Sequence, residues 1–324
     1  MKIFYTLFLS ICILILSGCT PKLTVKSLHP SLIPNEKINS LFIEQFDSDN
    51  INQTEAIENK LSNTIIKQKK VFVLKTNEEN VDAIIKGKVL ESSLNYDVYY
   101  KKDLNRQRCR IYEYDKNNKV KRCIQYYNRY IPCENRYYKV STKIELLDSN
   151  EEEILFSKIY TKTREINKCY DEYYYTFPRF TRDKKEINSQ LAEDIAYEIQ
   201  RDISPHYKYF ELEIIEEFDD NKNITKEQKS TLSNIAQLIE DNNINTAQSL
   251  LKELNFELAN KSWEVLYNLA LTYEAVFNLS NANLLYKQAS KLTSNTKNLA
   301  LINNAINRTK RNLEEKIKAK SQLP

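Results

Sequence analysis

The chain has 324 residues and a formal net charge of +4, and 41% of its residues are hydrophobic and 28% charged. This ordinary globular balance excludes disorder throughout, and the length exceeds that of one compact core of ordinary size, so two domains are predicted. The two glycines, Gly18 and Gly87, are too few for the phosphate-cradling loops of dinucleotide-binding and P-loop enzymes, which excludes both classes.

The N-terminus has the pattern of an export signal. Lys2 precedes an apolar run over residues 3–16, and Leu-Ser-Gly-Cys follows at residues 16–19. The run is shorter than the roughly 20 residues of a membrane-spanning helix. Residues 16–19 resemble the lipobox of bacterial lipoproteins; an ordinary secretory signal with a chance cysteine is the alternative. The resemblance implies a signal peptide over residues 1–18 and acyl chains on Cys19 that hold the protein to the lipid bilayer.

The residues after the lipobox predict where the protein is held. Thr20 takes the position at which, in the same resemblance, an aspartate would favour retention in the inner membrane. We therefore predict an outer-membrane location facing the periplasm, with the cell surface as the alternative. Residues 19–34 contain Pro21, Pro30 and Pro34, which disfavour regular structure, so this segment is predicted to be a lipidated tether.

The predicted first domain, residues 35–209, opens with alternating strand and helix patterns. Apolar runs at 41–43 and 71–74 predict short strands, and apolar residues at helical spacing over 56–70 predict an amphipathic helix between them. A longer strand is predicted over 82–96. This order of elements is typical of a mixed α/β domain.

Two further elements close this domain. Residues 140–146 place their charges on one face, and a polar turn leads into 154–161, which predicts a β-hairpin. Isoleucine and leucine recur every four residues from Ile187 to Ile203, and Pro205 ends the pattern. A helix that packs on the sheet is therefore predicted.

One run in this domain resembles a known family. Residues 81–89, Val-Asp-Ala-Ile-Ile-Lys-Gly-Lys-Val, are similar to a run in envelope lipoproteins with curli-secretion-like or amino-terminal TolB-like domains. The segment 101–138 departs from that pattern and is predicted to be an insertion. The resemblance implies a structural or assembly role in the cell envelope.

Four cysteines lie close together in the first domain. With Cys12 in the signal peptide and Cys19 lipidated, an oxidising compartment would let the remaining four form two disulfides, for which three connectivities remain open. They are Cys109, Cys123, Cys133 and Cys169. A zinc site is the alternative, but no CxxC spacing occurs and neither histidine is near them in the sequence.

The segment from Tyr96 to Tyr175 holds fifteen of the 22 tyrosines, and residues 101–143 carry thirteen Lys and Arg against four Asp and Glu. Such a mixture can bind nucleic acid in the cytosol, but export argues against that partner. The favoured interpretation is a disulfide-linked insertion whose tyrosines cover a sheet. The alternative is a binding surface for an anionic glycan, an anionic lipid or an acidic protein surface. The candidate side chains are Arg106, Arg108, Arg110, Lys121, Arg122, Tyr126, Tyr127 and Arg129.

A change of composition marks a second domain. Residues 210–225 are predicted to be a linker, and Thr225 with Gln228 forms the pattern of a capping box. An all-α domain is then predicted over 226–320. The fold class is therefore predicted as α+β, an N-terminal mixed α/β sandwich domain followed by a helical domain.

The helical domain resembles tetratricopeptide repeats over residues 263–296, with a degenerate copy about 35 residues earlier. Its matching residues are Trp263, Leu269, Ala270, Tyr273, Ala282, Tyr286 and Ala289. The resemblance implies stacked helix pairs whose concave groove binds envelope proteins, with a last helix as a cap. A domain that only braces the first one is the alternative.

The residues available for catalysis are few. The chain has two histidines, His29 in the predicted tether and His206 after the helix-ending proline, and no serine lies in a nucleophile elbow. We therefore predict a protein that is not an enzyme and uses no cofactor or metal. The predicted function is a scaffold or assembly factor that acts through protein contacts. The alternative is a binding module for lipopolysaccharide or peptidoglycan.

Overall fold

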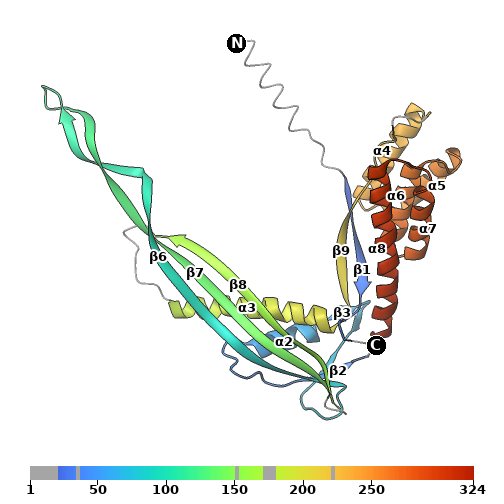
Figure 1. The fold of residues 1–324 in the computed structure, drawn as a ribbon, viewed down its shortest axis with the longest axis horizontal. Coiled ribbons are helices and arrows are strands. Elements are labelled where there is room, and N and C mark those ends of the chain that lie inside the picture. Colours follow the sequence, from blue (N-terminus) through green and yellow to red (C-terminus); the bar gives the residue numbers. More distant parts are fainter. Residues whose placement is uncertain (1–20, 34–36, 150–152, 171–179, 220–222) are drawn as a thin grey trace. The chain divides into compact units, whose positions relative to one another are not determined.

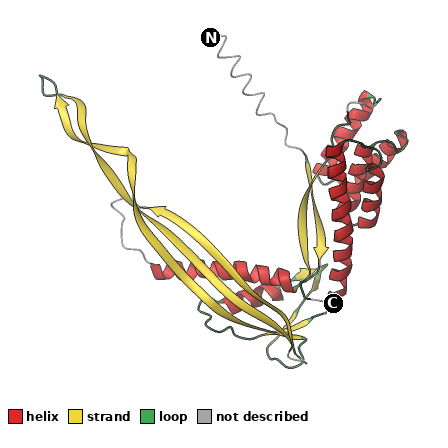
Figure 2. Ribbon diagram, viewed as in Figure 1, coloured by secondary structure: helices red, strands yellow, loops and turns green. Residues whose placement is uncertain are grey.

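The computed structural model describes residues 21–33, 37–149, 153–170, 180–219 and 223–324, which form two compact units. The first unit combines the N-terminal residues as far as Pro30 with Pro205–Ser321, and the second contains Ser31–Ser204 and the last three residues. Helices and mixed sheets are both present (Figure 2), which confirms the α+β class.

The second unit is built on a five-stranded sheet with the strand order β5-β2-β6-β7-β8. Its strands are β2 (Ser40–Ile43), β5 (Val73–Lys75), β6 (Ala83–Tyr114), β7 (Val120–Asp148) and β8 (Ile154–Cys169). Strand β2 is parallel to β5 and β6, whereas β6, β7 and β8 are antiparallel in series. The predicted hairpin over 140–161 is thereby confirmed.

Helices α2 (Gln53–Ser62) and α3 (Phe180–Ile203) pack against one another and against this sheet (Figure 1). The predicted periodicity of α3 is confirmed, because Leu191, Ile195 and Ile199 are buried. The buried Gln53 side chain joins the layers: it donates to the carbonyl of Ala192 in α3 at 2.9 Å and accepts from Thr142 in β7 at 3.0 Å.

Helix α2 ends at Ser62, whereas the sequence pattern predicted a helix as far as Lys70. The reason is local, because β3 (Ile65–Ile66) and β4 (Lys69–Lys70) form a small hairpin. Its turn uses positive φ angles at Lys67 and Gln68. In β6, the ring of Phe46 lies where a Cβ of Gly87 would be, which is why a glycine occupies that strand.

Strands β6 and β7 extend far beyond the predicted strand over 82–96. Strand β8 pairs with β7 only as far as the Cys133–Cys169 position. Beyond that point β6 and β7 continue alone to a turn at residues 115–119 (Figure 1). The segment interpreted as an insertion is therefore a continuation of the hairpin that β6 and β7 form. We call its two-stranded part, residues 100–132, the distal ribbon.

The predicted tether is wrong for residues 22–29. Strand β1 (Lys22–His29) pairs antiparallel with β9 (His206–Glu213) along its whole length. Pro21 and Pro30 flank this strand and do not interrupt it, while Leu23 and Val25 alternate with polar residues and are buried. Alternation favoured a strand here, and the partner strand lies far away in the sequence.

The helices of the first unit are α4 (Lys226–Glu240), α5 (Ile244–Glu257), α6 (Trp263–Ala275), α7 (Leu279–Ala289) and α8 (Thr296–Ser321). Each packs against the next in the chain. The capping box at the start of α4 is confirmed, because the Thr225 side chain accepts from the backbone N–H of Gln228 and the Gln228 side chain accepts from that of Thr225.

Candidate functional site

The residues predicted to line a partner groove are packing residues. Six of them, Trp263, Leu269, Ala270, Ala282, Tyr286 and Ala289, are buried, and Tyr273 is half-buried. They belong to or pack on one hydrophobic cluster of the first unit.

The first unit's own strands cover part of its helical array. Helix α6 is buried along almost its whole length and contacts β1 as well as α5 and α7. Leu23, Val25, Leu212 and Ile214 belong to the same cluster as the α6 side chains. The side chain of Asn268 exchanges hydrogen bonds with the backbone N–H and carbonyl of Ile215. A partner could reach this face of α6 only by displacing β1 and β9.

A buried ion pair holds α8 on α6 and α7. Both carboxylate oxygens of Glu274 accept from the Arg308 guanidinium, at 2.9 and 3.0 Å, and Glu274 also accepts from the Tyr286 hydroxyl at 3.0 Å. Burial and then the nearby Glu274 carboxylate raise the pKa of Tyr286 well above its usual value. The hydroxyl thus stays protonated, and the cluster stabilises the fold without offering a reactive group.

The two histidines of the chain, far apart in sequence, meet on the β1–β9 sheet. His29 and His206 are cross-strand partners with ring centroids 6.1 Å apart. Nδ1 of His29 contacts the carboxylate of Glu315 in α8. Burial lowers the pKa of His29 to about 4, and the positive charge of Lys208 adds to the effect. The sequence pattern placed both histidines in irregular segments and did not predict this contact.

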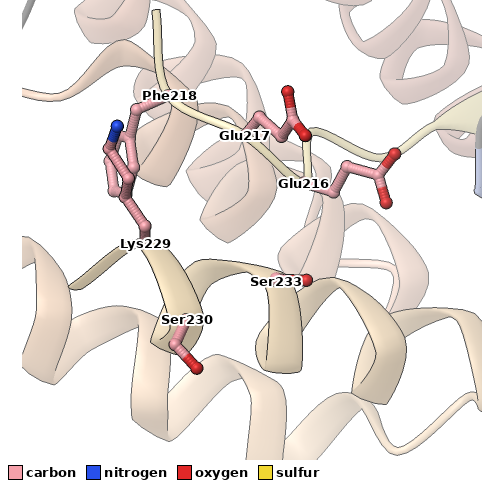
Figure 3. Close-up of a pocket in the computed structure, with 6 residues that line it drawn as sticks. All are labelled: Glu216, Glu217, Phe218, Lys229, Ser230 and Ser233. Atoms are coloured by element: carbon pink, nitrogen blue, oxygen red, sulfur yellow. The ribbon is translucent and has the colours of Figure 1, made fainter. Parts of the chain in front are cut away.

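A pocket of the helical unit, about 400 Å³, lies between the segment after β9 and α4. It is lined by Glu216, Glu217, Phe218, Lys229, Ser230 and Ser233 (Figure 3). The two glutamate carboxylates point away from the Ser230 hydroxyl (Figure 3). Histidine is absent from the residues that line this pocket, so neither serine has a Ser–His pair there to activate it as a nucleophile.

The distal ribbon exposes large side chains that a sheet would ordinarily bury. Tyr100 is 68% exposed, and seven further tyrosine, isoleucine and valine side chains of the ribbon are about half exposed. They are Ile111, Tyr112, Tyr114, Val120, Ile124, Tyr126 and Tyr130. Strand β8 does not reach these residues, because it pairs with β7 only as far as Cys133.

The prediction of two disulfides is confirmed, and the structure selects one of the three connectivities. Cys109 pairs with Cys123 and Cys133 with Cys169. The first bond links the two strands of the distal ribbon near its tip. The second links β7 to the end of β8, where the ribbon begins. Because all four thiols are in disulfides, they are not zinc ligands in this structure.

Half of the predicted anionic-ligand side chains are described, and all of these are exposed on the distal ribbon. They are Arg110, Lys121, Arg122 and Tyr126. Glu113 pairs with Lys121 at 3.2 Å and with Arg122. The remaining four, Arg106, Arg108, Tyr127 and Arg129, have backbones in β6 and β7, but their side chains lie outside the described residues.

A buried polar cluster at the base of the distal ribbon was not predicted. Arg136 donates to Glu134 at 2.9 Å, to Asp183 of α3 at 2.8 Å and to the Tyr170 hydroxyl at 2.8 Å. Burial is the largest single effect and would lower the pKa of Arg136, but Glu134, Tyr138, Asp183 and Tyr170 together outweigh it and raise that pKa. The side chains of Arg136 and Glu134 are 8% and 1% exposed. The cluster ties the ribbon's base to α3.

Three predictions concern anchoring and metals. Cys19, the predicted lipidation site, lies outside the described residues. None of the described helices combines the length and apolar character needed to cross a bilayer. Among the described side chains, no three His, Cys, Asp or Glu gather as a metal ion would require.

No family model matches this sequence, and no match was found among curated proteins. Among solved structures, the chain is similar to a minor lipoprotein from Acinetobacter baumannii, with 13% identity and a TM-score of 0.27 over 51% of this chain and 92% of that one. A PelC dodecamer from Paraburkholderia phytofirmans has 9% identity and a TM-score of 0.28, covering 56% and 96%. A DUF330 protein from Xanthomonas campestris has 10% identity and a TM-score of 0.27, covering 52% and 84%. Similarities of this size assign no function to the chain.

Proposed function

We propose that this chain is a lipid-anchored, non-catalytic protein of the outer membrane, and that its distal ribbon binds an anionic component of the cell envelope. One observation carries the proposal. Residues 100–132 hold ten Lys and Arg against three Asp and Glu, together with six tyrosines. Most of the described large side chains of this ribbon are exposed, and β8 pairs with β7 only as far as Cys133, where the ribbon begins.

The envelope location is supported by the lipobox resemblance at Cys19 and by the two disulfides, which persist in oxidising compartments. The anchor would be short. Strand β1 begins at Lys22, and the carbonyl of Pro21 already accepts from the backbone N–H of Ile214. Cys19 and Pro21 are two residues apart, or at most about 7 Å. The helical unit would then lie close to the bilayer, not at the end of a tether.

Binding of the chain to purified lipopolysaccharide and to peptidoglycan fragments, measured between 50 and 500 mM salt, tests the ribbon. Exposed charges are screened within about 10 Å at 0.1 M salt. We therefore expect affinity to fall steeply with salt and to fall further when Lys116 and Lys119 are both changed to Gln. The matched control changes Lys287, exposed on α7, and Lys291, exposed just after α7, to Gln. Equal binding by both variants would contradict the proposal.

A second candidate function is a scaffold that acts through protein contacts of a tetratricopeptide-like helical array. It is favoured by the two successive helix pairs and by Phe256 and Leu284, which are 82% and 55% exposed. Because β1 and β9 cover α6, such contacts would use the outer surfaces of α5 and α7.

Crosslinking of the lipidated chain in envelope membranes tests this second candidate. We expect a partner that is recovered with the native chain to be lost when Phe256 and Leu284 are changed to Ser. Ile159, which is 55% exposed on β8, is changed to Ser as the control. Point variants are used because removing the helices would uncover Leu23 and Val25. A partner that both variants retain would count against the helical array.

A further inference from the structure

Both faces of the distal ribbon carry exposed side chains with apolar surface. Successive residues of a strand point to opposite faces. At the ribbon's base Tyr100 pairs with Pro132 and Lys101 pairs with Ile131 in a regular stretch of the ladder, so Tyr100 and Ile131 point to opposite faces. Tyr100 is 68% exposed and Ile131 is partly exposed. Nearer the tip, at a shift in the register of the two strands, Ile111 and Tyr112 are 48% and 44% exposed. A groove on a rigid partner would cover one face and leave the other in water, whereas a medium that surrounds the ribbon would cover both.

Positive charges lie along the ribbon, both at its base and near its tip. Within the part of the chain that the structure describes, five exposed cations there form no ion pair, namely Lys101, Lys102, Arg110, Lys116 and Lys119. The acidic groups near the tip are already engaged. Asp115 accepts from the backbone N–H groups of Asn117 and Lys119 and so closes the turn, and Glu113 pairs with Lys121 and Arg122.

Tyrosine together with lysine and arginine is the composition of a membrane–water interface. The tyrosine ring lies in the apolar boundary with its hydroxyl among the headgroups, and the long basic side chains extend to the phosphates. Each Lys or Arg near an anionic membrane adds to the attraction. Apolar surface on both faces and unpaired cations around it thus match a lipid headgroup layer better than a soluble polymer or a protein groove.

We propose that the end of the distal ribbon enters the headgroup layer of a bilayer that contains anionic, phosphate-bearing lipid. The Cys109–Cys123 disulfide holds the two strands together there without a third strand or a helix. This inference rests on the function proposed above and names the component that the ribbon binds. The contact is separate from the proposed acyl anchor at Cys19, about 80 residues earlier in the chain.

The first test measures vesicle binding by the oxidised chain from residue 20 onward, which keeps every described residue and carries no acyl group. We expect it to sediment with vesicles of phosphatidylethanolamine and phosphatidylglycerol and much less with phosphatidylcholine vesicles. The double change of Lys116 and Lys119 to Gln should weaken binding about 25-fold, or about fivefold for each charge. The same double change at Lys287 and Lys291 should leave it unaltered.

The second test locates the ribbon in the bilayer. Tyr114→Trp adds an indole near the tip, and the native Trp263, which is 3% exposed, serves as an internal reference. We expect lipids brominated near the headgroup to quench the added indole and to leave Trp263 emission unchanged. Tyr209→Trp is the control, because Tyr209 is 68% exposed on β9, outside the ribbon, and should not be quenched.

The outcomes separate this inference from the proposed function. Salt-sensitive binding to peptidoglycan fragments without binding to anionic vesicles would overturn the inference and leave the proposed function standing. Vesicle binding without quenching at Tyr114→Trp would also overturn it, since the ribbon would then lie outside the headgroup layer. If neither probe binds, both proposals fail together.

Discussion

Two antiparallel two-stranded ribbons in this chain are stabilised in different ways. Strands β1 and β9 pair along their length and press one face on helices, so that Leu23, Val25 and Leu212 are buried. The distal ribbon is also a two-stranded pair, but its tyrosines are exposed and a disulfide links its strands.

The difference teaches what each ribbon requires. An isolated two-stranded ribbon is at best marginally stable in water, so it needs an apolar face against another layer or a crosslink. The first ribbon has the layer and therefore contributes to a core. The second has the crosslink and a polar cluster at its base, which leaves its side chains available for a ligand. If the proposed function holds, stability and binding depend on different ribbons.

The largest effect is expected from Arg136→Met at the base of the distal ribbon. The change would leave Glu134, whose side chain is 1% exposed, without its counter-charge. Removing one partner of a buried pair costs about 3–5 kcal/mol of unfolding free energy. Urea unfolding of the oxidised chain would measure this cost.

The control for Arg136 is Lys139→Met, since Lys139 pairs with Glu91 at 2.6 Å on an exposed surface of the same strand. Exposed pairs contribute about 0–1 kcal/mol. Equal loss of stability in both variants would mean that the buried cluster is no more important than a surface ion pair.

The next largest effect tests the ribbon formed by β1 and β9, which helices cover on one face. Leu23→Ala would remove a side chain that is 3% exposed in the core of the first unit. We expect a loss of about 2–4 kcal/mol in unfolding free energy, as for other buried leucines, and no change in ligand binding by the distal ribbon. Thr24→Ala is the control, because Thr24 is exposed on the same strand. An unaltered melting temperature for Leu23→Ala would show that β1 is not part of the core.

A smaller effect on stability is expected from a change of pH, through His29 at the end of β1. The pKa of His29 is lowered from 6.5 to about 4, first by burial and then by the charges of Lys208, His206 and Arg311. The unfolded chain therefore binds more protons between pH 6.5 and 4, so this stability is complete above pH 6.5 and is lost as the pH falls through that range. Glu315, in contact with His29, would favour a protonated ring and offset part of the loss. We expect the unfolding free energy to fall by about 1–2 kcal/mol over this pH range, whereas the pKa shift alone corresponds to about 3 kcal/mol.

The measurement is the unfolding free energy of the native chain and of His29→Phe at pH values from 7.5 to 4.5. The variant should lose stability less steeply below pH 6.5. His206→Phe is the comparison, because His206 is less buried than His29. Parallel curves for the native chain and His29→Phe would rule out His29 as the source of the pH dependence.

Much of the fold could be predicted because its signals are local. Helix α3 followed from residues repeating every four positions, and α4 from the capping box at Thr225. The pairing of β1 with β9 could not be predicted, because a strand pattern does not identify a partner more than 170 residues away. Its flanking prolines instead suggested a tether. The length of β6 and β7 was also missed, since a ribbon exposed on both faces lacks the apolar alternation by which strands are recognised.

The candidate site was predicted in composition but not in geometry. The excess of basic residues and tyrosines identified the segment, but only the register shows that β8 stops at Cys169 and leaves the distal ribbon uncovered. The choice among disulfide connectivities also depends on that register. The sequence did not indicate the role of Arg136, because the pattern of a basic run is the same whether one of its arginines is buried or exposed. The repeat motif, in contrast, identified packing residues correctly and gave no sign that β1 covers α6.

The smallest effect on global stability is expected from changing Cys109 and Cys123 to Ser. A disulfide that closes a loop of about 15 residues restricts the unfolded state by about 3 kcal/mol, but here the loop packs on no core. We therefore expect the unfolding free energy of the second unit to change by less than about 0.5 kcal/mol, while amide exchange over residues 108–126 becomes much faster. Binding by the ribbon should weaken as its order is lost. Changing Cys133 and Cys169 to Ser is the comparison, because Cys133 is fully buried and its loss should lower global stability. Unchanged exchange without the Cys109–Cys123 bond would mean that the ribbon's own strand pairing is sufficient to keep it ordered.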